Sequence, residues 1–168
     1  MGLFSFLKNA GAKLFGHKEE AKPAENAGGL TPEQQASVDA IRKQTREAAL
    51  VSEVVKMGLK VENLSVDLQN DTAIVYGQCD TQADKEKVIL TVGNVDGIGY
   101  VDDRLEVLNP EEDSQFHEVQ SGDTLSKIAK HYYGDAMKYP VIFEANQPML
   151  TNPDLIYPGQ VLRIPPIA

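Results

Sequence analysis

Hydrophobic and polar positions recur along this chain in patterns that first predict a long helix. Thr31 can cap that helix, Pro32 fits its first position, and Gln34 completes a capping box. The helix is predicted to run to about Met57 and to stop at Gly58, because glycine commonly follows the end of a helix.

Strict alternation of apolar and polar residues comes next and predicts a β-hairpin with one buried face. The alternating apolar residues are Leu64, Val66 and Leu68 before a turn at Asn70 and Asp71, and Ile74 and Tyr76 after it. Successive side chains of a strand point to opposite faces, so these apolar residues gather on one of them.

A second helix is predicted to open at Thr81, where Asp84 follows at capping distance, and to end at Gly97. Its apolar stripe is formed by Val88, Ile89, Val92 and Val95. The third strand that follows has apolar residues at Val101, Leu105 and Val107. This order, helix-strand-strand-helix-strand over residues 31–108, predicts a three-stranded sheet with helices on one face, an α+β sandwich.

The rest of the chain predicts a second module over residues 116–168, after an acidic linker at 109–115. Its predicted elements are a strand at 116–119, a helix from Asp123 to Gly134, a helix at 139–145 and a strand at 161–164. Asp123 is expected to cap the first of these helices, and Gly134 to end it. The whole chain is therefore expected to be α+β, with a βααβ module last.

The first fifteen residues place apolar side chains at spacings compatible with one face of a helix. These side chains are Leu3, Phe4, Leu7, Leu14 and Phe15. We expect a short helix over residues 1–15 that docks on its own protein, because its few lysines make a membrane anchor the weaker alternative. Residues 16–30 are expected to form a flexible linker.

Charge and composition narrow the possible partners. A formal net charge of −9 over 168 residues argues against nucleic acid, because phosphate binding needs clustered Lys and Arg. A small cation is a more natural partner. A single cysteine excludes an internal disulfide framework, the apolar N-terminal run is too short for a signal peptide, and no stretch approaches the roughly 18 apolar residues of a membrane span. A cytoplasmic protein is expected.

Residues capable of catalysis do not cluster in the sequence. His17, His117 and His131 lie far apart, and none has a Cys, Asp or Glu at the spacing of metal ligands or of a nucleophile and its base. We expect surface histidines, and at Cys79 a packed thiol with no catalytic role. The chain is therefore expected to be a binding protein and not an enzyme.

Longer motifs are specific enough to compare with known domains. FHEVQSGDTLSKIA (116–129), IFEAN (142–146) and IYPGQVLRIP (156–165) closely resemble a LysM domain. Residues 31–108, with VGNVDGIGYVDD at 92–103, resemble a BON domain, whose usual element order agrees with the pattern above. The combination, preceded by MGLF, resembles the bacterial potassium-binding protein family over nearly the whole chain and departs from it in residues 16–30.

That resemblance implies a cytoplasmic, monomeric protein that binds K⁺, or a larger monovalent cation, as a sensor or buffer in osmotic stress. It implies main-chain carbonyl ligands from the N-terminal segment and from the loop after the second helix. The matching positions are Leu7, Ala10, Ala12, Gly93, Val95 and Ile98. Neutral oxygens suit K⁺, which is large and weakly charged. We expect K⁺ to compact the protein and to dock the LysM module.

From the residues alone, the end of the second helix has two interpretations. The helix dipole and the turns that Gly93, Gly97 and Gly99 permit favour a cation there, but the same glycines are typical of an ordinary helix end. The neighbouring Asp102 and Asp103, together with Asp96, suggest a divalent-cation cluster. Because successive residues of a strand point to opposite faces, a solvated edge and one partly buried acid are expected instead.

The LysM resemblance implies a groove for glycans that contain N-acetylglucosamine, such as peptidoglycan. The matching positions are Gly122, Asp123, Thr124, Leu125, Asp154, Leu155 and Ile156. Helix capping by Asp123 and Thr124, and core packing by Leu155 and Ile156, would explain the same residues without a glycan. A peptidoglycan-binding envelope protein is the main alternative function. Phospholipid contact through the BON domain is a third, which the acidic charge disfavours.

Overall fold

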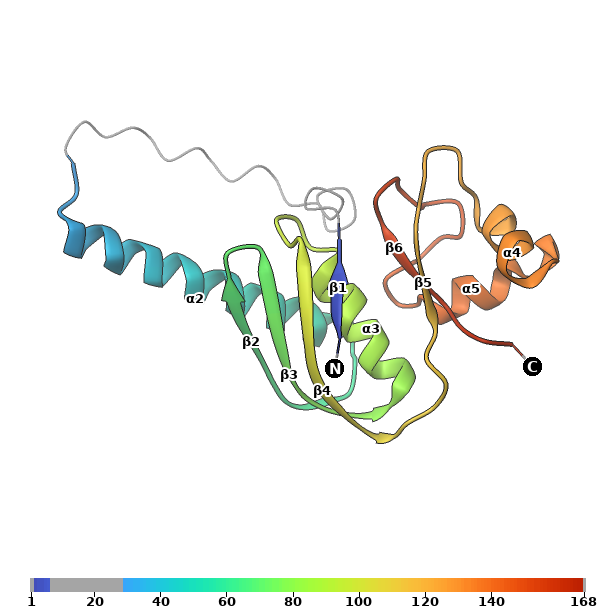
Figure 1. Ribbon diagram of the computed structural model, residues 1–168, viewed down its shortest axis with the longest axis horizontal. Coiled ribbons are helices and arrows are strands. Elements are labelled where there is room, and N and C mark those ends of the chain that lie inside the picture. The colour runs from blue at the N-terminus through green and yellow to red at the C-terminus, as the bar shows by residue number, and fades with distance from the viewer. Residues whose placement is uncertain (1, 7–28, 168) are drawn as a thin grey trace.

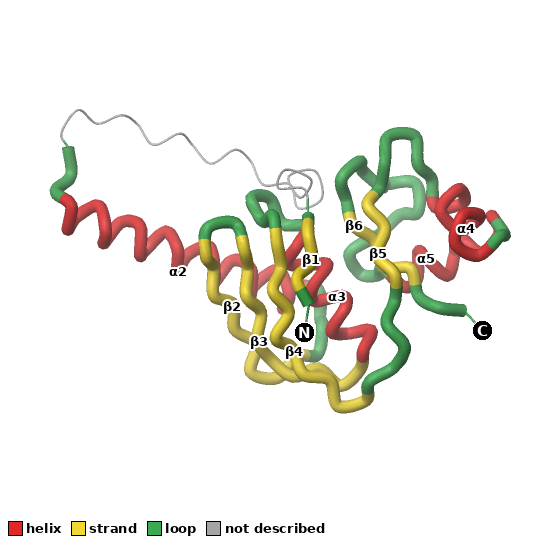
Figure 2. Tube along the Cα trace, in the orientation of Figure 1, coloured by secondary structure: helices red, strands yellow, loops and turns green. Residues whose placement is uncertain are grey.

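The computed structural model describes residues 2–6 and 29–167 and arranges them in two parts, each with its own sheet (Figures 1 and 2). The first part contains β1 (Leu3–Ser5), α2 (Pro32–Lys56), β2 (Val61–Gln69), β3 (Thr72–Thr81), α3 (Gln82–Gly93) and β4 (Tyr100–Asn109). The second contains β5 (Gln115–Glu118), α4 (Leu125–Tyr133), a 3₁₀ turn η1 (Ala136–Lys138), α5 (Tyr139–Ala145) and β6 (Val161–Ile164). The predicted α+β class is confirmed.

The larger sheet has the strand order β1-β4-β3-β2. β2 and β3 form the predicted antiparallel hairpin, and α3 is the crossover that returns the chain so that β4 lies parallel to β3. Helices α2 and α3 cover one face of the sheet, and the N-terminal half of α2 extends past its edge (Figure 1). The prediction of three strands missed the fourth, because β1 comes from the first residues of the chain.

The helix boundaries follow the capping signals closely. The Oγ1 of Thr31 accepts the Gln34 N–H at 3.3 Å, and the Gln34 side chain accepts the Thr31 N–H at 2.9 Å, so the predicted capping box is complete. Thr81 caps α3 as predicted. That helix ends at Gly93 and not at Gly97, because Asn94 caps its C-terminus.

The predicted helix over residues 1–15 is wrong where the structure describes it. Residues 3–5 form a strand that pairs antiparallel with β4, with Phe4 opposite Val101. An alternating pattern explains this outcome: Leu3 stays 67% exposed, whereas Phe4 and Phe6 point into the core on the other face. The free edge of β4 supplies the backbone partners that a three-residue strand needs. Residues 7–28, with the rest of this helix and most of the proposed linker, lie outside the described residues.

The smaller part is a two-stranded antiparallel sheet of β5 and β6 with α4 and α5 packed beside it (Figure 1). Thr124 and not Asp123 is the N-cap of α4, and Gly134 ends the helix in the left-handed conformation that glycine permits. The second helix spans residues 139–145, as predicted. Buried residues of α4, α5 and β6 form the core of this part.

The two parts touch through α3 and β6, which lie side by side (Figure 1). Val161 of β6 belongs to the hydrophobic core of the first part. At the other end of the contact, the ring centroids of Phe4 and Phe116 lie 5.1 Å apart. The segment between β4 and β5 thus joins domains that share a packed interface.

Candidate functional site

The loop between α3 and β4 begins where the carbonyl groups of a helix end would otherwise lack partners. Its backbone turns tightly: the Val95 N–H donates to the Val92 carbonyl and the Ile98 N–H donates to the Val95 carbonyl, each at 3.2 Å. Within residues 2–6 and 29–167, no hydrogen bond is found to the carbonyl oxygens of Gly93 and Ile98. Among the described residues these two oxygens have no donor, and the Val95 oxygen keeps its second lone pair.

The N-terminal strand ends directly beside this loop. The N–H of Phe6 donates to the Gly99 carbonyl at 2.8 Å, and the N–H of Asp103 donates to the Gly2 carbonyl at 2.9 Å. The Phe6 ring lies so close to Gly93 that a Cβ added there would be 2.2 Å from the ring. The structure therefore brings the start of the chain to the positions predicted on the loop.

Of the six predicted ion ligands, the structure describes three. Gly93, Val95 and Ile98 all lie in or next to the α3–β4 loop. The other three, Leu7, Ala10 and Ala12, lie outside the described residues. The hairpin turn holds the loop from a third side, because the Asp71 carbonyl accepts the N–H groups of Gly99 at 2.8 Å and Tyr100 at 3.1 Å.

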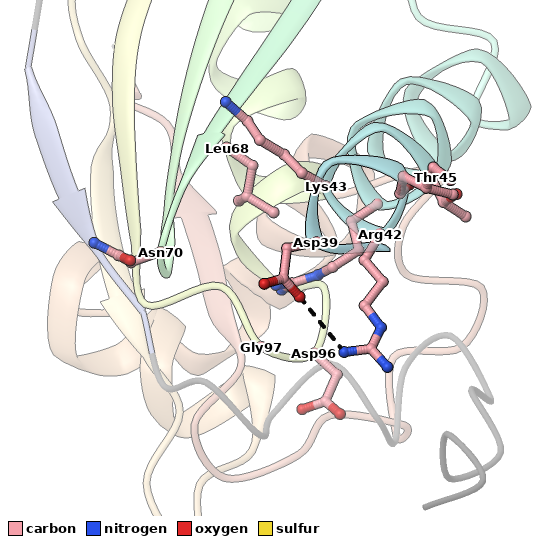
Figure 3. A pocket seen from close by; sticks show the side chains of 10 residues that line it. Asp39, Arg42, Lys43, Thr45, Leu68, Asn70, Asp96 and Gly97 are labelled. Carbon is pink, nitrogen blue, oxygen red and sulfur yellow. Dashed lines mark hydrogen bonds and ion pairs between the residues drawn. The ribbon is translucent and has the colours of Figure 1, made fainter. Parts of the chain in front are cut away.

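Charged side chains surround an open cavity of about 980 Å³ between α2 and this loop (Figure 3). Asp96 and Gly97 line it from the loop, while Asp39 and Arg42 line it from α2 and form an ion pair at 3.7 Å. Gly97 has a φ of +85°, and a Cβ built there would lie 3.0 Å from an Nη2 atom of Arg46. The guanidinium group of Arg46 therefore packs against the loop at Gly97.

The acidic pair on β4 does not form a cation cluster. Asp102 pairs with Arg104 at 3.0 Å, whereas Asp103 is buried on the opposite face and pairs with Lys85 at 2.8 Å. In the described part of the chain, no three His, Cys, Asp or Glu residues are grouped closely enough to hold a metal ion. The two acids point to opposite faces of β4, as expected, with Asp102 partly exposed and Asp103 fully buried.

Asn94 is a site residue that the sequence reasoning missed. It lies between Gly93 and Val95, is 2% exposed, and forms two hydrogen bonds with the backbone of Val161 in the second domain. Its Nδ2 donates to the Val161 carbonyl and its Oδ1 accepts the Val161 N–H, both at 3.0 Å. One side chain of the loop therefore completes the edge of β6 in the manner of a neighbouring strand.

A buried ion pair forms a second link between the domains. Glu86 of α3 pairs with Arg163 of β6, and the Ser114 N–H donates to Glu86 at 2.8 Å. Burial alone would raise the pKa of Glu86, but the hydrogen bonds from Arg163 and Ser114 outweigh it and hold that pKa below its usual value. Gln82 extends the network by donating to Asp113 at 2.6 Å.

The predicted glycan positions largely surround one groove of about 320 Å³ in the second domain. Its lining residues are Asp123, Thr124, Leu125, Ser126, Tyr139, Pro153, Asp154 and Ile156. Gly122 and Leu155 are not among them, although Leu155 is 51% exposed, which contradicts its interpretation as a core residue. The sequence reasoning missed Ser126, Tyr139 and Pro153, because they belong to the groove only in three dimensions.

His117 is not the surface histidine that its spacing predicts. Its Nε2 lies 2.9 Å from an Oδ2 of Asp123, and its Nδ1 lies 3.2 Å from the Tyr132 hydroxyl. The Gln120 N–H also donates to Asp123, and this bond, followed by the one to His117, lowers the pKa of the carboxyl. The network holds Asp123 at one end of the groove.

Comparisons with known proteins agree with both domain resemblances. A BON domain model matches residues 37–109 and a LysM domain model matches residues 117–165. The chain is 41% identical over 167 residues to "Potassium binding protein Kbp" of Escherichia coli O6:H1, which covers 98% of this chain and 99% of that protein. It is also 62% identical over 47 residues to an uncharacterised protein of Deinococcus radiodurans, a match that spans 28% of this chain and 18% of the relative. No helix in the described ranges is long and apolar enough to cross a membrane.

Proposed function

This chain belongs to the family of the potassium binding protein Kbp, and we propose that it is itself a cytoplasmic, monomeric K⁺-binding protein that senses or buffers the ion in osmotic stress. It acts by binding and not by catalysis. The proposal rests on the full-length similarity to the relative and on one structural observation, the meeting of the N-terminal strand with the α3–β4 loop.

The proposed ligands are main-chain carbonyl oxygens from two segments. They belong to Leu7, Ala10, Ala12, Gly93, Val95 and Ile98. Their chemistry fits K⁺, because several neutral carbonyl dipoles can replace the hydration shell of a large monovalent ion, whereas harder divalent ions prefer carboxylates. Two observations support this part of the site. The carbonyl oxygens of Gly93 and Ile98 accept no hydrogen bond from the described residues, and the C-terminus of α3 has a partial negative charge.

Ion binding in this arrangement favours the compact form of the protein. When bound, K⁺ is coordinated by the carbonyl dipoles of both segments and so joins the N-terminal segment to the BON domain. Any ligand that binds one conformation better than another shifts the population toward it. We therefore expect K⁺ to raise the thermal midpoint and to strengthen the contact between α3 and β6.

Calorimetric titration of the cation-stripped protein with KCl, NaCl and CaCl₂ tests which ion the protein binds. Saturable heat with KCl alone is the expected result, and equal binding of all three salts would contradict the proposal. A variant that lacks residues 1–12 tests the location. The thermal midpoint of this variant without K⁺ reports the loss of β1. The decisive quantity is therefore the further rise in the thermal midpoint on adding KCl, which should vanish. An undiminished rise would place the ion elsewhere.

Glycan binding by the LysM domain is the second candidate function. The groove between the loop after β5 and the loop before β6 supports it, because it joins five of the predicted positions and is also lined by the aromatic residue Tyr139. Co-sedimentation of the full chain with purified peptidoglycan tests it, with Tyr139→Ala as the paired variant. An envelope role also requires export, so fractionation of cells distinguishes it from the cytoplasmic proposal.

A further inference from the structure

We propose that His117 is a positioning residue of the glycan groove: it holds the Asp123 carboxylate in one orientation and leaves one of its oxygens to accept a hydrogen bond from a sugar. Asp123 lines the groove, whereas His117 is not among the lining residues and acts through it. This inference rests on glycan binding, the second candidate function, because an oriented carboxylate matters for recognition only if a sugar enters the groove.

Both hydrogen bonds to the Asp123 carboxylate fall on the same oxygen. Its Oδ2 lies 2.9 Å from Nε2 of His117 and accepts the N–H of Gln120, also at 2.9 Å. Within residues 2–6 and 29–167, no donor is found at Oδ1. An ionised carboxylate only accepts hydrogen bonds, so Oδ1 keeps its lone pairs for an N–H or O–H group of a ligand.

The ring of His117 is itself held in place. Because the carboxylate cannot donate, the proton of the neutral ring sits on Nε2, and Nδ1 then accepts from the Tyr132 hydroxyl, 3.2 Å away. The two rings also meet edge to face, with their centroids 5.6 Å apart. The His117 side chain is only 19% exposed. Packing and a second hydrogen bond therefore keep the Nε2–H directed at Asp123.

A second acid of the groove shows what this support adds. Asp154 also lines the groove and is exposed, but in the described part of the chain its carboxylate has no hydrogen bond and no ion pair. A free side chain loses rotamer entropy when a ligand immobilises it, whereas a side chain that is already fixed loses little. The supported carboxylate of Asp123, and not that of Asp154, therefore sets the orientation of a bound sugar.

The size of the effect follows from the rotamers of Asp123. If only a fraction of molecules hold the carboxylate in the binding orientation, the apparent dissociation constant rises by the inverse of that fraction. Three staggered χ1 rotamers of equal population would leave a fraction of about one third. Loss of the bond from His117 should therefore weaken glycan binding about threefold.

The test compares His117→Phe with His117→Gln in the full chain. Each variant is titrated by calorimetry with the tetramer of N-acetylglucosamine, at a temperature where circular dichroism shows it to be folded. Phenylalanine keeps a ring against Tyr132 but has no donor, whereas glutamine has no ring but carries an amide N–H at about the reach of Nε2. His117→Phe should raise the dissociation constant about threefold, and His117→Gln should retain most of the affinity. A purely structural role of the ring predicts the opposite order, which would overturn the positioning role.

Two further variants serve as controls. His131→Phe makes the same substitution in the other histidine ring that packs on Tyr132, at a centroid distance of 4.9 Å, and should leave the affinity unchanged. Asp123→Ala should weaken binding at least as much as His117→Phe, and the two substitutions together should weaken it no further, because His117 acts through Asp123. An additional loss in the double variant would contradict that route.

The unaltered protein separates failure of the positioning role from failure of glycan binding. If it binds the tetramer and His117→Phe binds equally well, the positioning role is wrong and glycan binding stands. If it binds no tetramer, both proposals fall together.

Discussion

Replacing Asn94 by alanine tests whether the α3–β4 loop holds the two domains together. The substitution removes both hydrogen bonds to Val161 and leaves a backbone N–H and a carbonyl without partners in a contact where Val161 is 5% exposed. An unsatisfied buried polar group costs about 1–3 kcal/mol, so we expect docking to weaken by about 2–4 kcal/mol. A change of about 3 kcal/mol shifts an equilibrium more than about a hundredfold.

Urea unfolding and limited proteolysis together measure this effect. The domains of Asn94→Ala should unfold in separate transitions, and cleavage within residues 110–114, between β4 and β5, should accelerate. Asn109→Ala is the control, since it removes one exposed hydrogen bond to the Asp80 carbonyl and should change stability by less than about 0.5 kcal/mol. Asn94→Ala that unfolds in one transition, with the stability and cleavage rate of the control, would refute the reasoning.

Three further predictions follow from charged and buried side chains in the first domain. The pKa of Glu86 is lowered on folding, so the ionised Glu86 stabilises the protein above the ordinary pKa of 4.5, and this stabilisation is lost as the pH falls through the lowered pKa. The urea midpoints of the unaltered protein and of Glu86→Gln should therefore converge between pH 7 and pH 3. Arg46→Gln removes a positive charge beside the loop and should strengthen K⁺ binding about two- to threefold at low salt. Arg42→Gln, which removes a charge paired with Asp39, should have less effect. An unchanged dissociation constant for Arg46→Gln would contradict this prediction. Burial raises the pKa of Cys79 to about 11, so its thiol should react with a disulfide reagent at the rate of global unfolding, and fast reaction of the folded protein would be the contrary result.

Local signals were sufficient to predict most of the fold. The capping box at Thr31 and the glycine at Gly134 act within one or two turns of the chain, so the sequence defines the ends of α2 and α4 to within a residue or two. Residues 3–5 were harder. A short run with only a few apolar residues is compatible both with a helical stripe and with an alternating strand. The unpaired edge of β4 decides between the two.

The site depends on contacts that no local pattern encodes. Asn94 binds a strand 67 positions later in the chain, and His117 meets Asp123 only after the β5–α4 loop folds back. Carbonyl ligands are harder still to predict from a sequence, because every residue has a carbonyl group and the side chains do not indicate which carbonyl groups face an ion. For Gly93, Val95 and Ile98 the prediction therefore depended on the family resemblance, with the glycines as weak support.

The α3–β4 loop is held from three directions by parts of the chain that are distant in sequence. Phe6 binds it from the N-terminal strand, Asp71 from the hairpin turn, and Val161 from the LysM domain through Asn94. A loop fixed in this way loses little conformational entropy when it binds a ligand, so its affinity depends on the anchors as much as on the oxygens. Since main-chain ligands tolerate changes of side chain, substitutions that sever an anchor should weaken ion binding more than substitutions of the exposed side chains within the loop.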